Sequence, residues 1–491
     1  MPSDSQPADE NRHPSRSERR PRVLFALVVL AAVGLGGIAV TRAIDALTTT
    51  RRPPSVVLIL VDTLRADYLG AYGFDGPVSP NLDAFAGESV LFERAFSQAP
   101  WTKPSIASLF TSLQPETHKV LSHEGKYGDA EHGSTEALPA EAATIAESFQ
   151  AAGYATAAFV ANPWMLREHG FAQGFDVYDQ HEGGLPPTTE AMLRPVRRWL
   201  AARKPGEPFF LYLHLMDVHG PYDAPDADYE AVRDSPGLGP AHTLTAEEMS
   251  GLRRYLLRAR WVNGDDVREL RTWRGRYAAG VHAVDRQLGP FLEEMKQSRV
   301  LDESIVVVTA DHGEELCDNG GWDHGFRLWD NQIRVPLLVH LPGGAGAGRR
   351  VEDVVSLIDL MPTLLAQGGI TPPDAAQGHD FSSLLEGGAG DGPGVSYAGG
   401  VKWSPELHSL RAPDWKLIRD GRAGPTQLFD LTTDPGEQHD VSQARPHELA
   451  SLEGTLAAHQ DALAVLPSLA PAQGEVSDEM KKRLEALGYA H

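Results

Sequence analysis

The sequence predicts an α/β protein with a mostly parallel central sheet flanked by helices, followed by a small antiparallel sheet. Two observations support this fold class. Runs rich in Val, Ile and Leu alternate with amphipathic segments along the first three quarters of the chain, which is typical of parallel strands joined by crossover helices. After about Leu385 the runs become shorter and are separated by Gly, Pro and Asp turns, which is typical of antiparallel strands.

Each expected element is visible as a run of letters. The apolar runs SVVLILVD, ATAAFVA, PFFLYLHLMD, ESIVVVTAD and VPLLVHLP predict buried strands. EAATIAESFQAAGY and RGRYAAGVHAVDRQLGPFLEEMKQ predict helices, and SDEMKKRLEALGY predicts a terminal helix that Ser477 caps. GVSYAGGV, LHSLRAPDWKLIRD and TQLFDLTTD predict the strands of the antiparallel sheet.

These elements suggest a division of the chain into consecutive parts. The predicted parts are a basic leader (1–22), a transmembrane anchor (23–43), a linker (44–55), a catalytic domain (56–385), an antiparallel subdomain (386–465) and a terminal helix (466–491). Residues 223–274 are long, charged and partly helical, so we interpret them as an insertion near the mouth of the site.

The N-terminus predicts attachment to a membrane. Residues 12–22 include five arginines, and residues 23–41 carry no charged side chain. That run approaches the ~20 residues that a spanning helix needs. Arginines in front of a span stay in the cytoplasm, so we expect a single-pass anchor with a periplasmic or extracellular catalytic domain. A cleaved signal peptide and a twin-arginine export signal are the alternatives.

The charge of the chain argues against one class of partner, and its cysteine content excludes an internal disulfide. The formal net charge is -23, which argues against nucleic acid as a partner because binding to a phosphate backbone needs clustered Lys and Arg. Cys317 is the single cysteine, so no disulfide can form within one chain.

Polar residues follow three of the predicted strands. Asp62 follows the first strand, Asp217 and His219 follow a second, and Asp311 and His312 follow a third. Ligands collect at the carboxyl ends of parallel strands, so these residues predict a shared site. Asp62, Asp311 and His312 form a mixed oxygen and nitrogen set suited to a divalent cation such as Mg, Mn, Ca or Zn. Without a cation such carboxylates would repel, and one would stay protonated.

Thr102 is the alcohol available to this predicted site. A cation lowers the pKa of an alcohol in its coordination sphere and so activates it as a nucleophile. Thr102 lies at a turn into a helix, whose N-terminal amides suit an anion. The alternative is that Thr102 only caps the helix. With the strand-end residues in place, we interpret Thr102 as both a metal ligand and the nucleophile.

Three other residues are candidates for binding the anionic group or protonating the leaving oxygen. These are His219, His324 and Lys103, with His219 and His324 also assigned to catalysis. The alternative for each histidine is that it lies in a loop and makes hydrogen bonds only to the backbone. The alternative for Lys103 is that its side chain is solvated. We interpret His214 as a core histidine on a strand, and Asp67 as a surface residue.

Several motifs together resemble the sulfatase family of the alkaline-phosphatase superfamily. VVLILVDTLRADYLGAYG resembles the opening strand and turn, TKPSIASLFTS the nucleophile segment, DVHGPY a later loop, and TADHGEEL the late metal motif. WDHGFRLWDNQIRVPLLVHLP, SLIDLMPTLL and LRAPDWKLIRD continue the family order, so the resemblance covers most of residues 56–445. It implies an alkaline-phosphatase-like fold and a metal-dependent hydrolase of sulfuric or phosphoric esters, with a glycan or lipid as the alcohol part of the substrate.

The sequence departs from that family at three positions. Thr102 stands where the family matures Cys or Ser to formylglycine, so no formylglycine is expected, since threonine cannot form the aldehyde. Ile106 replaces the supporting arginine, and Thr63 replaces the second aspartate of the opening turn. The remaining Thr, Asp, Asp and His set resembles the phosphoglycerol and phosphoethanolamine transferases of the superfamily. A transferase acting on lipid or glycan, and an inactive sulfatase-like binding protein, are therefore the alternatives to a hydrolase.

Overall fold

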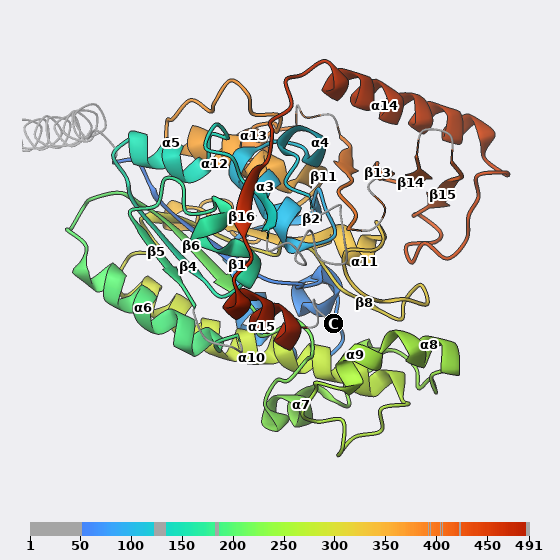
Figure 1. Cartoon of the computed structure of the whole chain (residues 1–491). Helices are drawn as coiled ribbons and strands as arrows, with labels where there is room; N and C mark the ends of the chain where they lie inside the picture. The colour runs from blue at the N-terminus through green and yellow to red at the C-terminus, as the bar shows by residue number, and fades with distance from the viewer. Residues whose placement is uncertain are drawn as a thin grey trace, which may run out of the picture. The chain divides into compact units, whose positions relative to one another are not determined.

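An eight-stranded sheet forms the centre of the folded part of the chain (Figure 1). The computed structural model describes residues 52–121, 134–181, 186–390, 392, 394–402, 404, 406–421 and 424–487. The predicted leader (1–22), the spanning helix (23–43) and most of the linker lie outside these residues. No helix among the described residues has both the length and the apolar character that crossing a membrane requires.

The strands of this sheet occur in an order that differs from their order in the chain. The order across the sheet is β11 (Arg350–Ser356), β2 (Val90–Phe96), β10 (Arg334–His340), β7 (Ser304–Thr309), β1 (Ser55–Val61), β6 (Phe209–Leu215), β4 (Ala155–Val160) and β5 (Val177–Gln180). The block from β7 to β5 is parallel throughout, whereas β10 runs antiparallel to its two neighbours. The predicted mostly parallel sheet is therefore confirmed, with β10 as the exception.

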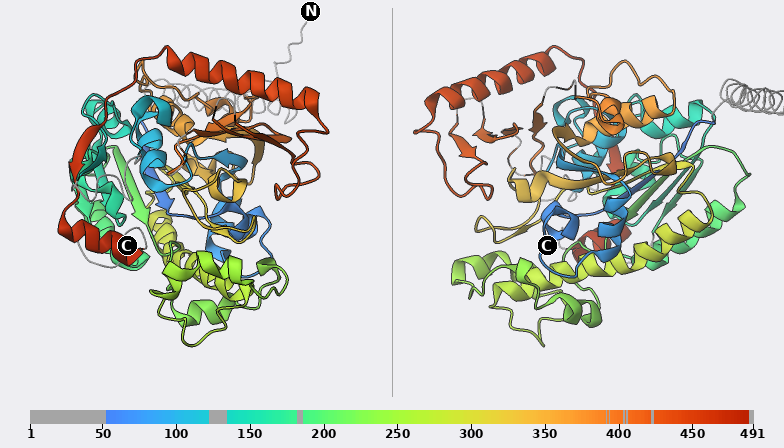
Figure 2. Two further views of the ribbon diagram at one scale, coloured as in Figure 1. Left: turned by 45° about the vertical axis from the view of Figure 1, so that its right-hand side comes forward. Right: turned by 180° about the vertical axis from the view of Figure 1, so that it is seen from behind.

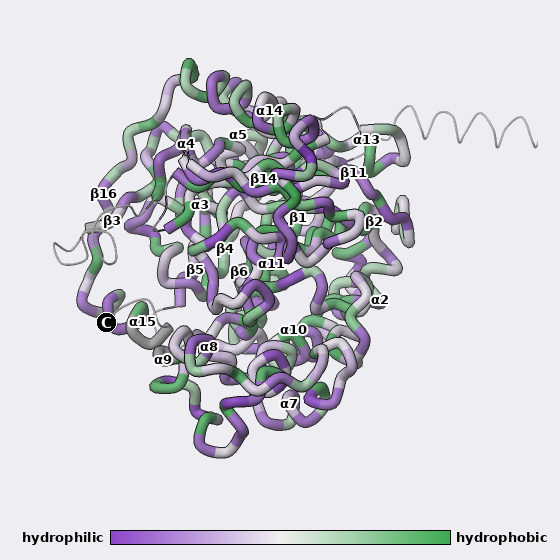
Figure 3. The backbone as a smooth tube through the Cα atoms, turned by 90° about the vertical axis from the view of Figure 1, so that its right-hand side faces the viewer, coloured by the Kyte–Doolittle hydropathy of each residue, from purple (hydrophilic) through white to green (hydrophobic). Residues whose placement is uncertain are grey.

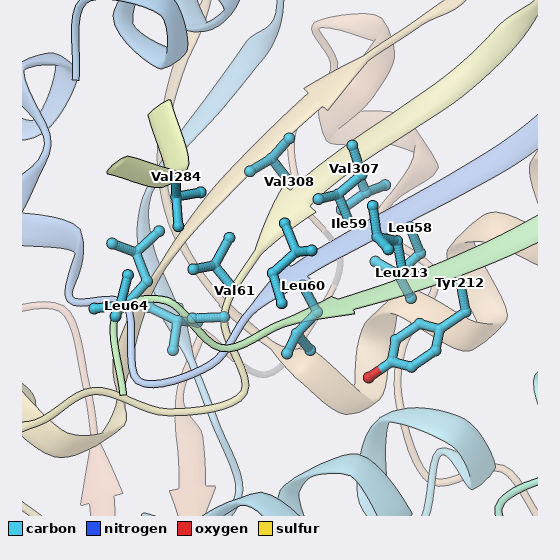
Figure 4. Close-up of a cluster of buried hydrophobic side chains, with 14 of the residues drawn as sticks. Leu58, Ile59, Leu60, Val61, Leu64, Tyr212, Leu213, Val284, Val307 and Val308 are labelled. Carbon is cyan, nitrogen blue, oxygen red and sulfur yellow. The ribbon is translucent and has the colours of Figure 1, made fainter. Parts of the chain in front are cut away.

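Burial on both faces explains why the central strands are almost wholly apolar. The side chains of Val56 to Val61 in β1 have no exposed area, and the same holds for Ile305 to Val308 in β7. Figure 4 shows Leu58 to Val61, together with Val307 and Val308, in one cluster with Leu213 of β6 and Val284. Fully burying each such side chain stabilises the fold by about 1.5–3 kcal/mol.

Helices cover the two faces of the sheet, as the alternating pattern predicts. In the two views of Figure 2 one layer lies on each side of the strands. One layer contains α3 (Thr102–Thr111), α4 (Pro115–His118), α5 (Ile145–Ala151), α12 (Leu360–Gln367) and α13 (Ser382–Glu386); the other contains α2 (Pro80–Gly87), α6 (Thr189–Ala202) and α10 (Leu270–Gln297). Short connecting helices are η1 (Ala66–Tyr68), η2 (Gly70–Tyr72), η3 (Pro163–Met165), η4 (Arg167–His169), α11 (Asp330–Ile333), η6 (Pro342–Gly344) and η7 (Leu357–Asp359).

The segment predicted as an insertion forms short helices before α10. They are α7 (Asp226–Val232), η5 (Pro236–Leu238), α8 (Ala246–Gly251) and α9 (Arg253–Leu256). The segment packs on α10 and accepts a hydrogen bond at the Glu248 carbonyl from Nε1 of Trp322, at 3.0 Å. Trp322 belongs to the hairpin β8 (Glu315–Leu316) and β9 (Trp322–Asp323), so the segment contacts the loop that leads to His324.

The C-terminal part forms the predicted antiparallel sheet. Its strands are β12 (Ser396–Ala398), β13 (Leu407–Arg411), β14 (Trp415–Asp420) and β15 (Thr426–Asp430). Helix α14 (Pro446–Ala464) packs on this sheet through Leu456, and Figure 3 shows the backbone of α14 and β14 from that side. The predicted terminal helix is α15 (Asp478–Leu487), and it follows a strand that the sequence did not suggest, β16 (Ala472–Glu475), paired with β3 (Ser134–Ala137).

Candidate active site

Four adjacent parallel strands end at the candidate site. Going across the sheet, β7 is followed by Asp311 and His312, β1 by Asp62, and β4 by Asn162, while β6 carries His214 next to its end. Thr102 is the first residue of α3. The carboxyl ends of parallel strands share one sheet edge, and this brings together residues that are far apart in the sequence.

Asp62 is fully buried and accepts several hydrogen bonds at one oxygen. Its Oδ2 lies 3.0 Å from Nε2 of His214 and 2.6 Å from Nδ2 of Asn162. Burial opposes ionisation, but the hydrogen bond from His214 and the charges of His219, His214 and His312 together lower the pKa of Asp62 below its usual value. The other oxygen, Oδ1, is buried and has no hydrogen-bond partner among the described residues.

Asp311 is also fully buried, and its two oxygens differ in the same way. Oδ1 accepts hydrogen bonds from the backbone amides of Thr63, at 3.3 Å, and His312, at 3.0 Å. Oδ2 is buried, and no residue in the described part of the chain forms a hydrogen bond with it. Burial, followed by the charge of Asp62, raises the pKa of Asp311 well above its usual value. The protein alone therefore does not favour two ionised carboxylates here, in agreement with the repulsion expected from the sequence.

His312 directs the lone pair of its Nε2 toward Oδ1 of Asp62 and Oδ2 of Asp311. Its Nδ1 lies 2.8 Å from the Gly313 carbonyl, which can only accept, so Nδ1 carries the proton. Nε2 then lies 3.4 Å from Oδ2 of Asp311 and 3.8 Å from Oδ1 of Asp62. Burial, followed by the charge of His324, lowers the pKa of His312 well below its usual value. A neutral imidazole with Nε2 unprotonated is the form that binds metal ions.

The Thr102 hydroxyl points into this cluster and does not cap its helix. Oγ1 lies 3.3 Å from Nε2 of His312, 3.5 Å from Oδ2 of Asp62 and 3.3 Å from Nδ2 of Asn162. The N-cap of α3 is Trp101, and no side chain caps the helix. The cap interpretation of Thr102 is therefore wrong, and its hydroxyl is directed at the residues predicted to hold a cation.

The donor atoms fit a divalent cation. Two buried carboxylate oxygens without hydrogen-bond partners, an imidazole lone pair and a hydroxyl converge from Asp62, Asp311, His312 and Thr102. A cation would compensate both charges and use the two oxygens. Asp62, His214 and Asp311 also offer ligand atoms within 4.8 Å of one another, but the hydrogen bond from Nε2 of His214 to Asp62 makes that nitrogen a donor. The Thr63 hydroxyl donates to the Asp62 carbonyl at 2.7 Å.

The two predicted anion-binding histidines lie beside the cluster. The rings of His219 and His324 are 5.1 Å apart between centroids, and His324 lies 4.4 Å from His312. Nδ1 of His324 lies 3.0 Å from Asp323 and 3.2 Å from Glu314, and Oε2 of Glu314 is buried without a hydrogen-bond partner. Glu314, Asp323 and His324 form another group whose ligand atoms lie within 4.8 Å, which the sequence analysis did not identify.

Lys103 is fully buried, so its interpretation as a solvated side chain is wrong. Nζ donates to Oγ1 of Thr135 at 2.5 Å and lies 3.9 Å from Glu136. Burial lowers the pKa of Lys103 to about 7; the charge of Glu136 opposes this shift and the charge of Lys402 adds to it. The contacts of Nζ are with Thr135, Glu136 and the ring of Trp164.

The structure assigns different surroundings to three other residues. His214 is a buried histidine on β6, as the sequence predicts; it donates to Asp62, and its Nδ1 lies 2.8 Å from the Tyr212 hydroxyl. Asn162 was missed, although its position after a strand is the same signal that identified Asp62. Asp217 lies outside the cluster and accepts a hydrogen bond from Thr189 at 2.8 Å.

A separate cavity of about 230 Å³ lies between β11, η7 and the C-terminal sheet. Its lining includes Asp359, Phe381, Tyr397 and His459, and none of the site residues described above lines it. The chemistry of the strand ends therefore does not take place in this cavity.

Together the sheet and its strand-end cluster define an α/β protein in which buried carboxylates, an imidazole and a hydroxyl meet at one edge of the sheet. Comparison with known proteins gives the family. Residues 54–370 match the sulfatase family model, and residues 318–461 match the model of the C-terminal part of N-sulphoglucosamine sulphohydrolase. The chain belongs to the sulfatase family and is an ester hydrolase.

Its relatives are distant but cover most of the chain. An arylsulfatase of Clostridium perfringens is 25% identical over 78% of this chain and 89% of its own length, and human N-acetylgalactosamine-6-sulfatase is 26% identical over 84% and 86%. The fold resembles that of the phosphonate monoester hydrolase of Agrobacterium radiobacter, with a TM-score of 0.66, 22% identity and coverage of 84% and 95%. A 2-O GAG sulfatase matches with a TM-score of 0.65, 18% identity and coverage of 86% and 95%.

Proposed function

We propose that this chain is a metal-dependent hydrolase of sulfuric or phosphoric esters in which Thr102 is the nucleophile. The observation that carries the proposal is the position of the Thr102 oxygen, 3.3 Å from Nε2 of His312 and beside the carboxylates of Asp62 and Asp311. Asp62, Asp311, His312 and Thr102 would hold the cation. A bound divalent cation would lower the pKa of the Thr102 hydroxyl and neutralise oxygens of the ester.

The reaction has two displacements. The Thr102 oxygen forms a bond to sulfur or phosphorus, and the bond to the ester oxygen breaks, so the alcohol leaves with the electron pair. Asn162 and Asp62 orient the Thr102 oxygen through the contacts described above, and the Thr102 proton passes to water. His219 or His324 donates a proton to the leaving oxygen, and Lys103 binds the anionic group. Water then breaks the bond to Thr102, which releases sulfate or phosphate.

The donor set favours a particular kind of cation. Four ligands that include an imidazole suit Zn or Mn, whereas Ca takes six to eight oxygen ligands. Thr63 stands where the family has the second aspartate of the opening turn, so this chain has one oxygen ligand fewer. This difference also favours Zn or Mn over Ca. Elemental analysis of the purified protein tests it.

The proposed function is tested by turnover. The purified protein is assayed on an aryl sulfate, a phosphomonoester and a phosphodiester with Zn, Mn, Mg or Ca, next to Thr102→Ala. We expect metal-dependent turnover of at least one ester class by the wild type and its loss in Thr102→Ala. Absence of turnover on all three classes, or full activity of Thr102→Ala, would overturn the proposal.

We also propose that residues 23–43 anchor the chain in a membrane with the catalytic domain on the periplasmic or extracellular side. The uncharged run behind five arginines supports this. Deletion of residues 1–43 should move the protein from the membrane fraction to the soluble fraction. Protease added from the outside should digest the catalytic domain of the intact chain, and protection of that domain would contradict the orientation.

A further inference from the structure

A loop of the C-terminal sheet is fastened to two parts of the candidate site. The loop connects β12 to β13, and its Gly400 carbonyl accepts a hydrogen bond from Nε1 of Trp101 at 2.8 Å. The backbone amide of Lys402 donates to the Gly325 carbonyl at 2.9 Å. Trp101 precedes Thr102 and Gly325 follows His324, so this loop is held against both the nucleophile segment and the histidine loop.

The loop brings a second lysine close to Lys103. Nζ of Lys402 lies 5.5 Å from the ring centroid of Trp101 and 5.9 Å from that of Trp164, and Nζ of Lys103 lies 5.6 Å from the Trp164 ring. Cation–π contact with the two indoles fixes where the ammonium groups lie. Ammonium groups that approach one ring in a buried site repel each other, and an anion bound near them relieves that repulsion.

The two lysines lie at different depths. Lys103 has no exposed area and directly follows Thr102, whereas Lys402 is 7% exposed. Glu136 lies 3.9 Å from Lys103 and so partly compensates the inner charge. The inner lysine is therefore suited to the reacting group, and the outer lysine is suited to a part of the substrate farther from Thr102.

We propose that Lys402 is a specificity-determining residue that binds a second anionic group of the substrate, so that the preferred substrates are sulfate or phosphate esters of acidic alcohols, such as sugars that carry a carboxylate or a further sulfate. The proposal rests on the proposed ester hydrolase function. The C-terminal sheet thereby contributes a residue that selects the substrate, and the Trp101 and Gly325 contacts hold that residue in place.

Binding of two sulfonates tests this assignment independently of turnover. Benzenesulfonate and 4-sulfobenzoate differ by one carboxylate and lack a cleavable ester. Calorimetry with the metal-loaded full-length protein should give at least about tenfold tighter binding of 4-sulfobenzoate. Lys402→Met should abolish this preference, Lys402→Arg should retain part of it, and the control Lys204→Met, at an exposed lysine, should leave it unchanged.

Turnover provides the second measurement. With phenyl sulfate and 4-carboxyphenyl sulfate, Lys402→Met should lower kcat/KM about tenfold or more for the carboxylated ester only. An equal loss on both esters would place Lys402 at the reacting group and overturn the proposal, as would a wild type without any preference for 4-sulfobenzoate. Lys402→Gln is the substitute if Lys402→Met does not fold. Failure of the wild type to cleave either ester, with the binding preference intact, would reject the cleavage of aryl sulfates and not the role of Lys402.

Discussion

The hydroxyl oxygen of Thr102 lies 3.3 Å from Nε2 of His312, although 210 positions separate the two residues in the chain. Strands β7 and β1 pair in parallel, so their ends coincide, and α3 begins at the same edge. Ser105, in the first turn of α3, fixes this placement by donating to the Asp311 carbonyl at 2.7 Å. The nucleophile segment and the late metal motif are thus joined by a direct hydrogen bond.

Replacement of Thr102 distinguishes the contribution of its hydroxyl to catalysis from the contribution of the surrounding residues. Thr102→Ala should lower kcat by at least about 10³-fold, because the remaining residues can position the ester but cannot form the covalent bond. Thr102→Ser keeps the hydroxyl and should retain much more activity. Steady-state kinetics on the ester cleaved by the wild type checks both variants. Equal activities of the Ala and Ser variants would show that the hydroxyl has no role.

Removal of the cation should affect activity and stability together. Chelation should abolish turnover, and readdition of the metal should restore it. Metal at about 100 times its Kd should stabilise the fold by about 2.7 kcal/mol if it binds only the native state, which is measurable as a rise in Tm. Asp311→Asn removes a buried carboxylate whose pKa is raised by burial and by Asp62. This variant should therefore match or exceed the metal-free wild type in Tm and show no rise with metal. If metal raised the Tm of Asp311→Asn as much as that of the wild type, Asp311 would be excluded as a ligand.

Lys103 predicts a pH dependence. Burial lowers its pKa to about 7, so the ammonium form predominates below that pH and is lost as the pH rises through it. If the ammonium binds the anionic group, kcat/KM of the wild type should fall above about pH 7. Lys103→Arg should keep its activity at higher pH, because a guanidinium stays charged. Lys103→Met should have a low kcat/KM that does not fall above about pH 7. If kcat/KM of Lys103→Met fell with pH as in the wild type, a group other than Lys103 would cause the fall.

Ion pairs of Asp330 attach the C-terminal sheet to the rest of the fold. Its carboxylate lies 3.0 Å from Nε of Arg411 and 2.7 Å from Nζ of Lys416, which belong to β13 and β14. Asp330→Ala removes the carboxylate that Arg411 pairs with and leaves Lys416 with Glu437 alone, at 3.6 Å, so it should cost up to about 3–5 kcal/mol of unfolding free energy. Glu230→Ala is the control, since it breaks an exposed pair with Arg233 that contributes about 0–1 kcal/mol. Chemical denaturation measures both, and equal costs would refute the anchoring role.

The sequence was sufficient to predict five of the eight strands of the central sheet and the meeting of Asp62, Asp311 and His312 at their ends. Strands that are buried on both faces form long apolar runs, and Asp62, Asp311 and His312 directly follow such runs, so their meeting point could be inferred. Strand β2 was missed because Glu93 and Arg94 interrupt its apolar run. Strand β16 was missed because the stretch from Ala472 to Glu475 is mostly exposed and pairs with a distant segment.

The supporting residues of the site could not be inferred in the same way. His214 contacts Asp62 because β6 pairs with β1 in a register that places His214 opposite Leu60, and no local pattern encodes that register. Lys402 lies in a loop of Gly, Lys and Trp whose sequence resembles any surface turn. Its burial depends on hydrogen bonds to Trp101 and Gly325, which only the folded chain reveals.

Detection of a covalent intermediate tests the central claim most directly. The enzyme is mixed with an excess of its ester, quenched in acid within one turnover and digested for mass spectrometry. Our account predicts that the peptide containing Thr102 gains the mass of one sulfo or phospho group, located on Thr102 by fragmentation. Rapid turnover with that peptide unmodified at every quench time, and the group found on another residue, would contradict it.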